Sequence, residues 1–175
     1  MACLQERGYA RTTARDLVAA SGTNLGAIGY HFGSKDALLT EALAESVRTW
    51  LAELGRLAAR LPEDTTLGEA MRELAAELYP ALERGAPLVA AFFEALAQAR
   101  RSDEVRDQLA SAYEEFRLAG AEIVAGMGHE DTADARAVSS VLMALIDGLM
   151  IQWFLDPAAP PSGEAVARAL RAMTA

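Results

Sequence analysis

The sequence has few of the residues on which most active sites depend: one cysteine and two histidines among 175 residues. A single cysteine excludes an internal disulfide framework and is typical of a reducing cytoplasm. Cys3 and His31 have neither metal-ligand spacing nor an evident catalytic partner. Acidic residues near His129 leave a metal site conceivable, although the helix dipole explains carboxylates at a helix start better. We therefore predict no catalytic residue, no metal site and no cofactor, and a protein that is not an enzyme.

Positive charge is also scarce, with 16 Lys and Arg against 25 Asp and Glu and a net charge of −9. Such a chain has no general attraction to a polyanion. Residues 1–35 nevertheless hold four basic and two acidic residues, a balance of +2, so the remaining 140 residues sum to −11. Any nucleic-acid binding would therefore be confined to the N-terminal end. Charge alone does not distinguish that end from ordinary surface.

Aromatic residues (6%), proline (6 residues) and glycine (13 residues) are sparse, and strict alternation of apolar and polar residues is rare. Alternation is the signature of a half-buried strand, whereas Ala and Leu at spacings of three and four favour helices. The fold class is therefore predicted to be all-α. At 52% hydrophobic residues the chain can bury a core. No secretion leader opens it, which predicts a cytoplasmic protein.

Residues 8–36 carry the most specific local pattern. Thr13 and Asp16 form a capping box, which begins a helix expected to end near Ala20, before Ser21-Gly22. Caps at Thr23-Asn24 begin a second helix, expected to end near Phe32. This layout predicts a helix-turn-helix, residues 13–32. Its inward residues are expected to be Leu17, Val18, Ala20, Leu25, Ile28 and Phe32.

The opposite face of the second helix carries Asn24, Ala27, Tyr30 and His31. These side chains are short or polar, so they can meet base edges and phosphates without burying an unpaired charge.

This segment resembles the DNA-binding domain of the tetracycline-repressor (TetR) family of bacterial transcription regulators. The resemblance rests on Tyr30-His31-Phe32-Gly33-Ser34-Lys35-Asp36-Ala37-Leu38 and covers about the first 43 residues. It implies a helix-turn-helix domain, residues 1–43, and a helical ligand-binding and dimerisation domain, residues 44–175. The implied function is that of a repressor released from an inverted-repeat DNA operator by a small, mostly apolar inducer. The base-contact candidates are Thr23, Asn24 and Ala27, and the phosphate-contact candidates are Thr13, Tyr30, His31 and Lys35.

Two departures from the family pattern leave an alternative open. The first helix, near residues 2–7, starts later than usual and is apparently incomplete. Gly29 stands where the family often has an aromatic ring, and glycine inside a helix costs about 1 kcal/mol relative to alanine. The alternative is a helical ligand- or partner-binding module in which DNA binding is weak or lost.

Beyond residue 35, helix breakers and caps divide the chain into further amphipathic helices. Pro62, the segment around Gly85, and Gly126 separate successive apolar stripes. The helices are predicted at residues 36–60, 66–84, 87–101, 103–125, 132–155 and 163–173.

The helix at 132–155 is apolar on nearly all sides, so it should pack on two opposite faces against surfaces that exclude water. A membrane span is one interpretation, but Asp147 at its centre would cost about 2.5–3.5 kcal/mol. We instead expect one face to pack on its own chain and the other on a second copy, as the last two helices do in the resembling family. The protein is thus predicted to be a homodimer without membrane contact. Its interface candidates are Val138, Val141, Leu142, Leu145, Leu149, Trp153 and Leu170.

Large, adaptable side chains recur on the middle helices. For each of them core packing is the simpler explanation, whereas the resemblance implies a cavity for the inducer. Asp147 should find a partner, point into a wet cavity or face the interface. The pocket candidates are Trp50, Leu54, Met71, Leu74, Leu78, Phe92, Phe93, Tyr113, Phe116, Met143, Asp147 and Met150.

Overall fold

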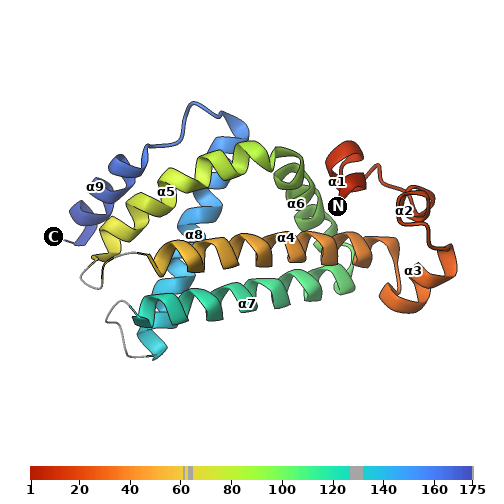
Figure 1. The fold of residues 1–175 in the computed structure, drawn as a ribbon, viewed down its shortest axis with the longest axis horizontal. Coiled ribbons are helices and arrows are strands. Elements are labelled where there is room, and N and C mark those ends of the chain that lie inside the picture. Colours follow the sequence, from red (N-terminus) through yellow and green to blue (C-terminus); the bar gives the residue numbers. More distant parts are fainter. Residues whose placement is uncertain (61, 63–64, 127–131, 175) are drawn as a thin grey trace. The chain divides into compact units, whose positions relative to one another are not determined.

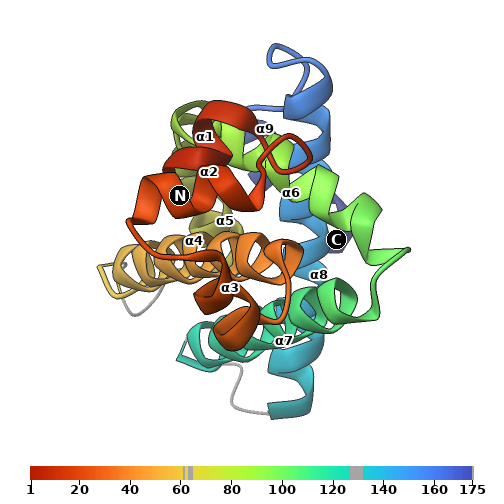
Figure 2. The same cartoon turned by 90° about the vertical axis from the view of Figure 1, so that its right-hand side faces the viewer.

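The computed structural model describes residues 1–60, 62, 65–126 and 132–174, and every regular element among them is an α-helix (Figures 1 and 2). The prediction of an all-α fold is therefore confirmed. The helices are α1 (Ala2–Arg7), α2 (Ala14–Ser21), α3 (Leu25–Phe32), α4 (Lys35–Ala58), α5 (Leu67–Arg84), α6 (Ala86–Ala99), α7 (Asp103–Gly126), α8 (Thr132–Leu155) and α9 (Gly163–Thr174).

The helices begin where side chains can cap them. At α2, the Asp16 carboxylate accepts hydrogen bonds from the Thr13 backbone N–H (2.9 Å) and hydroxyl (2.7 Å), while the Asp16 N–H donates to Thr13 Oγ1 (3.2 Å). Thr66 and Glu69 repeat the arrangement at α5. Each box satisfies N–H groups that the first turn leaves unpaired. Because these signals are local, the predicted bounds agree with the observed ones to within two residues.

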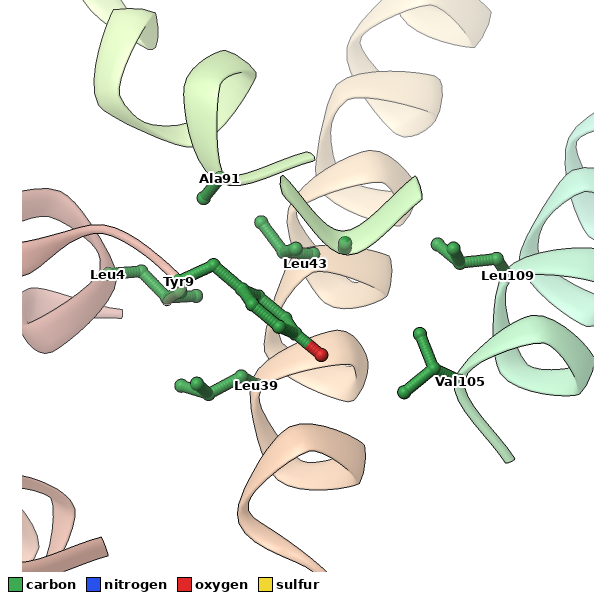
Figure 3. Close-up of a cluster of buried hydrophobic side chains, with 8 residues drawn as sticks. Leu4, Tyr9, Leu39, Leu43, Ala91, Val105 and Leu109 are labelled. Carbon is green, nitrogen blue, oxygen red and sulfur yellow. The ribbon is translucent and has the colours of Figure 1, made fainter. Parts of the chain in front are cut away.

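The described residues form two compact units. The first unit comprises Met1–Thr49 and Gly85–Glu114. The Tyr9 ring occupies the centre of its core (Figure 3), and the Tyr9 hydroxyl shares a 2.9 Å hydrogen bond with Thr40 Oγ1. Burial raises the pKa of Tyr9, so its hydroxyl stays protonated at neutral pH. The core cluster consists of Leu4, Tyr9, Leu39, Leu43, Ala91, Ala95, Val105 and Leu109.

The second unit comprises Trp50–Arg84 and Glu115–Ala175. Within it, α9 lies along α5. The Tyr79 hydroxyl donates a 2.8 Å hydrogen bond to the Pro161 carbonyl, which fixes the segment before α9 to α5.

Small residues join α7 to α8 in the second unit. Ser139 is buried and its hydroxyl donates to the Arg117 carbonyl at 2.9 Å. Gly120 faces Ser139 so closely that a Cβ atom at residue 120 would collide with the Ser139 hydroxyl. A glycine at residue 120 therefore allows the two helices to approach.

The first unit extends beyond the predicted N-terminal domain, residues 1–43, because it also contains α6 and the first half of α7. The isolated segment 1–43 has too few residues to bury much apolar surface by itself. The functional division at residue 43 stays a prediction.

Three residues of the helix-turn-helix do not lie inside as predicted. Ala20 is exposed, and Leu25 and Phe32 are 54% and 37% exposed. Both helices have only eight residues, so each can bury only a narrow stripe. Ile28 is buried and fills the middle of that stripe on α3.

Among the described helices, α8 is the one that could cross a membrane by length and composition alone, over Ala133–Leu155. Only 28% of its most apolar stretch is buried within the chain. The rest of that stretch is half-buried or exposed, so α8 keeps apolar surface that the described part of the chain does not fully cover.

Candidate nucleic-acid interface

Helices α2 and α3 pack against each other and form the predicted helix-turn-helix. Gly22 ends α2 with a φ of 68°, a left-handed conformation, and its N–H donates to the Val18 carbonyl. Glycine adopts this conformation without strain, so the chain can turn within three residues before α3 begins.

The polar face of α3 is open. Thr23, Asn24, Tyr30 and His31 are exposed, with Tyr30 85% exposed, whereas Ala27 is half-buried. Asn24 Oδ1 accepts from the Ala27 N–H at 3.0 Å. The Asn24 amide N–H groups stay available to base edges, which offer matching acceptors.

Two predicted phosphate contacts are already engaged. The Thr13 hydroxyl donates its proton to the Asp16 carboxylate, so it cannot donate to a phosphate at the same time. Lys35 is half-buried and its Nζ lies 3.0 Å from Asp36 Oδ1. A phosphate would have to compete with that carboxylate for the Lys35 ammonium. Exposed Arg15 on α2 was not among the predicted contacts, although its charge suits a phosphate equally well.

The Asp16 capping box should give the helix-turn-helix a pH dependence. Hydrogen bonds from the Thr13 side chain and backbone, with a smaller contribution from Arg7, lower the pKa of Asp16. Stability from this carboxylate is therefore present above its unfolded pKa, about 3.9, and is lost as the pH falls through the folded value. We expect Asp16→Asn to be less stable than wild type at pH 7. Thermal melts should show that difference shrinking below about pH 4, and a pH-independent difference would contradict the assignment.

Gly29 lies on α3 with open space around it: a Cβ there would meet no atom within 4 Å. The structure therefore gives no packing reason for a glycine at residue 29. The absence of a side chain leaves contacts on this turn of α3 to Tyr30 and His31, whose rings meet edge to face at 5.0 Å between centroids.

The pocket candidates fall into two groups. In the first unit, Phe92 contacts Phe93 and stacks on Tyr113 with centroids 6.4 Å apart and an interplanar angle of 12°. In the second unit, Trp50 and Phe116 have centroids 5.9 Å apart. The remaining second-unit candidates are buried (Met71, Leu78 and Met143) or half-buried (Leu74, Asp147 and Met150).

Asp147 takes part in an interaction within the chain, and its role in a cavity or at an interface stays a prediction. The Leu54 side chain and the whole of His129 lie outside the residues that the structure describes. A ligand site among the candidates stays a prediction.

Helix α8 has distinct inner and outer faces. Leu149 and Trp153 are 7% and 6% exposed, so their assignment to a dimer interface is wrong: they pack inside their own chain. Val138 and Leu142 also pack within their own chain, against a buried cluster of Ala121 and Val124 on α7 and Ala135 on α8. Of the other candidates, Val141 is 61% exposed, and Leu145 and Leu170 are half-buried.

The outer face of α8 includes apolar residues that were not predicted as interface. Ile151 and Phe154 are each 44% exposed and Leu155 is 77% exposed. Val141, Gly148, Ile151 and Leu155 follow one another at spacings of three, four or seven, which places them on one side of the helix. We call these four residues the α8 outer stripe.

Comparison with known proteins decides the family. Residues 1–42 match the model of bacterial regulatory proteins of the tetR family, and residues 67–175 match the C-terminal model of BetI-type transcriptional repressors. The second match alone covers more than half of the chain. The chain belongs to the TetR family. It is therefore a DNA-binding regulator of the repressor type, and small-molecule binding is typical of its family.

Solved structures share the TetR-family fold at low sequence identity. A protein from Pseudomonas aeruginosa PAO1 matches with a TM-score of 0.71 and 21% identity, over 99% of this chain and 83% of that one. A TetR transcription regulator from Haloarcula marismortui ATCC 43049 matches with 0.61 and 22%, over 99% and 89%. A protein from Saccharomonospora viridis, solved in complex with choline, matches with 0.61 and 23%, over 98% and 88%. No curated protein matches the chain.

Proposed function

We propose that this TetR-family regulator is a cytoplasmic homodimer that binds an inverted-repeat operator with one α3 helix from each protomer. The exposed polar face of α3 is the observation that carries the proposal. In this arrangement Thr23, Asn24 and Ala27 face base edges, while Tyr30, His31 and Lys35 contact phosphates. Two-fold symmetry places the recognition helices in successive major grooves, about 34–36 Å apart.

Substitutions at Lys35 and His31 test these roles. Lys35→Ala should weaken binding to all sequences alike and flatten the slope of log K against log salt by about 0.9 per half-site. His31→Gln keeps a donor and an acceptor and should retain most of the affinity, whereas His31→Ala should lose about 1 kcal/mol. Titrations of fluorescent duplexes at several salt concentrations measure both effects. If the three variants had the same affinity and the same salt slope as the wild-type protein, the assigned contacts would be contradicted.

The α8 outer stripe supports dimerisation of this chain. Val141, Ile151 and Leu155 are exposed and Gly148 is half-buried, so the described part of the chain leaves this apolar strip only partly covered. Such patches on soluble proteins usually mark contact surfaces. Gly148 lies within the stripe, and a Cβ there would meet no described atom within 4 Å, so it leaves room for a second copy of α8.

We further propose a small-molecule site in the second unit, beside Trp50 and Phe116. The tilted ring pair offers aromatic faces, which bind quaternary ammonium groups. The related protein from Saccharomonospora viridis was solved with choline, a ligand of that type. Elsewhere in the second unit, on α8, Trp153 Nε1 is a buried donor with no acceptor among the described residues.

Choline and its uncharged analogue 3,3-dimethylbutan-1-ol distinguish the possible ligand classes. We expect choline to raise the thermal midpoint more than the analogue and to weaken operator binding, and Trp50→Leu to remove both effects. A ligand at 100 times its Kd stabilises by about 2.7 kcal/mol, which a melt resolves readily. Equal shifts with both compounds would indicate a plain apolar pocket. No shift with either would contradict the site.

A further inference from the structure

Both connections that lead out of the helix-turn-helix are held by glutamates from distant helices of the first unit. Glu94 on α6 accepts a hydrogen bond from the Ala10 backbone N–H, with 2.6 Å between Oε2 and N. Glu104 on α7 accepts one from the Ser34 hydroxyl, with 2.9 Å between Oε2 and Oγ. Ala10 precedes α2 and Ser34 follows α3, so the two carboxylates bracket the helix-turn-helix.

Each contact lies beside a left-handed glycine. Gly8 and Gly33 have φ values of 76° and 75°. A Cβ at Gly8 would lie 3.5 Å from Glu94 Oε1, and one at Gly33 would lie 3.0 Å from Glu104 Oε1. The glycines therefore supply the turn and also leave space for the carboxylate.

Ser34 links Glu104 to the start of α4. The Ser34 hydroxyl accepts a hydrogen bond from the Ala37 N–H at 3.0 Å, which makes Ser34 the cap of α4. The same hydroxyl donates to Glu104. A shift of α7 would therefore reach Ser34, in the connection between α3 and α4.

We propose that Glu94 and Glu104 are positioning residues that hold the helix-turn-helix in its DNA-binding orientation on α6 and α7. Both hydrogen bonds are exposed to solvent, so water can replace them at low cost and they can open and close. Movement of α6 or α7 then changes the fraction of molecules in the binding orientation. This proposal rests on the proposed function, in which the dimer binds an inverted-repeat operator through α3.

A purely electrostatic role makes the opposite prediction. Carboxylates near DNA repel phosphates, so their removal would strengthen binding to every duplex, whether the replacement is Gln or Ala. A positioning role depends on the acceptor atom instead. Gln keeps an acceptor and removes the charge, whereas Ala removes both. The direction of the Ala effect and the difference between Gln and Ala therefore separate the two roles.

The test uses the full-length protein, the inverted repeat that wild type enriches from random duplexes, and an unrelated duplex. We expect the double variant Glu94→Ala, Glu104→Ala to bind the inverted repeat about tenfold more weakly. A loss of this size corresponds to about a tenth of the molecules keeping the DNA-binding orientation. Binding to the unrelated duplex should be unchanged or slightly stronger, and Glu94→Gln, Glu104→Gln should recover most of the loss. Glu122→Ala, an exposed position on α7 in the second unit, is the charge control and should match wild type.

Wild-type protein that enriches no inverted repeat would defeat the proposed function and not the glutamate contacts. If wild type does enrich one, three results would overturn the positioning role: unchanged affinity of the Ala double variant, equal effects of Gln and Ala, or stronger binding to both duplexes. Thermal melts accompany each titration. If the Ala variant is unfolded at the assay temperature, the single variants are titrated instead, with an expected loss of about threefold each.

Discussion

We expect Val141→Asp to convert the dimer into a monomer and to weaken operator binding by at least about a hundredfold, equivalent to about 2.7 kcal/mol. Val141 is 61% exposed at the N-terminal end of the α8 outer stripe. A symmetric interface would bury two copies of the introduced carboxylate without a partner, which is costly. A monomer then presents one α3 helix and meets only one half-site.

Sedimentation velocity at micromolar concentration measures the first effect, and duplex titration measures the second. The matched control is Leu118→Asp, which places the same charge at an exposed apolar position on α7 and should stay dimeric. Gly148→Phe is a second variant, because a Cβ there meets no described atom within 4 Å and the larger side chain should block a partner. Wild type that sediments as a single 18.6 kDa species would contradict the interface.

Gly163→Ala should destabilise the second unit by about 1–3 kcal/mol, the usual range for overpacking a close contact. A Cβ at residue 163 would lie 2.6 Å from the Arg72 carbonyl oxygen and 3.5 Å from Ala75 Cβ. Because the nearest atom belongs to the backbone of α5, it cannot move aside as a flexible side chain can. Relief requires α9 to separate from α5.

Chemical denaturation measures this loss, and hydrogen exchange should place it in α5 and α9. Gly55→Ala is the control, because a Cβ there meets no atom within 4 Å. It should stabilise α4 by up to about 1 kcal/mol through helix propensity. If the two alanine variants had the same stability, the close packing of α9 on α5 would be wrong.

The sequence predicted the helices well because their boundaries are set locally. Thr13 with Asp16 and Thr66 with Glu69 each form a cap within four residues, and such pairs can be found without knowing the fold. Gly22 ends α2 for a similarly local reason. The exposed face of α3 was also predictable, because burying the polar groups of Asn24, Tyr30 and His31 without partners would cost free energy.

The faces of α8 were not predictable in the same way. A helix that is apolar all round has no period to show which residues face inward, so Leu149 and Trp153 were assigned to the wrong side. The predictions that Leu25 and Phe32 lie inside were wrong for a related reason. The spacing of apolar residues on an eight-residue helix does not show how much of each side chain the rest of the chain covers. Glu94 and Glu104 could not be found at all, because their partners lie 84 and 70 residues away.

Selection of binding sites from a pool of random duplexes tests the central claim most directly. A dimer that reads DNA with α3 should enrich an inverted repeat whose half-site centres are 10–10.5 base pairs apart or a multiple of that spacing. Two chains should bind each selected duplex. Failure to enrich any motif, or enrichment of a single half-site bound by one chain, would contradict the account.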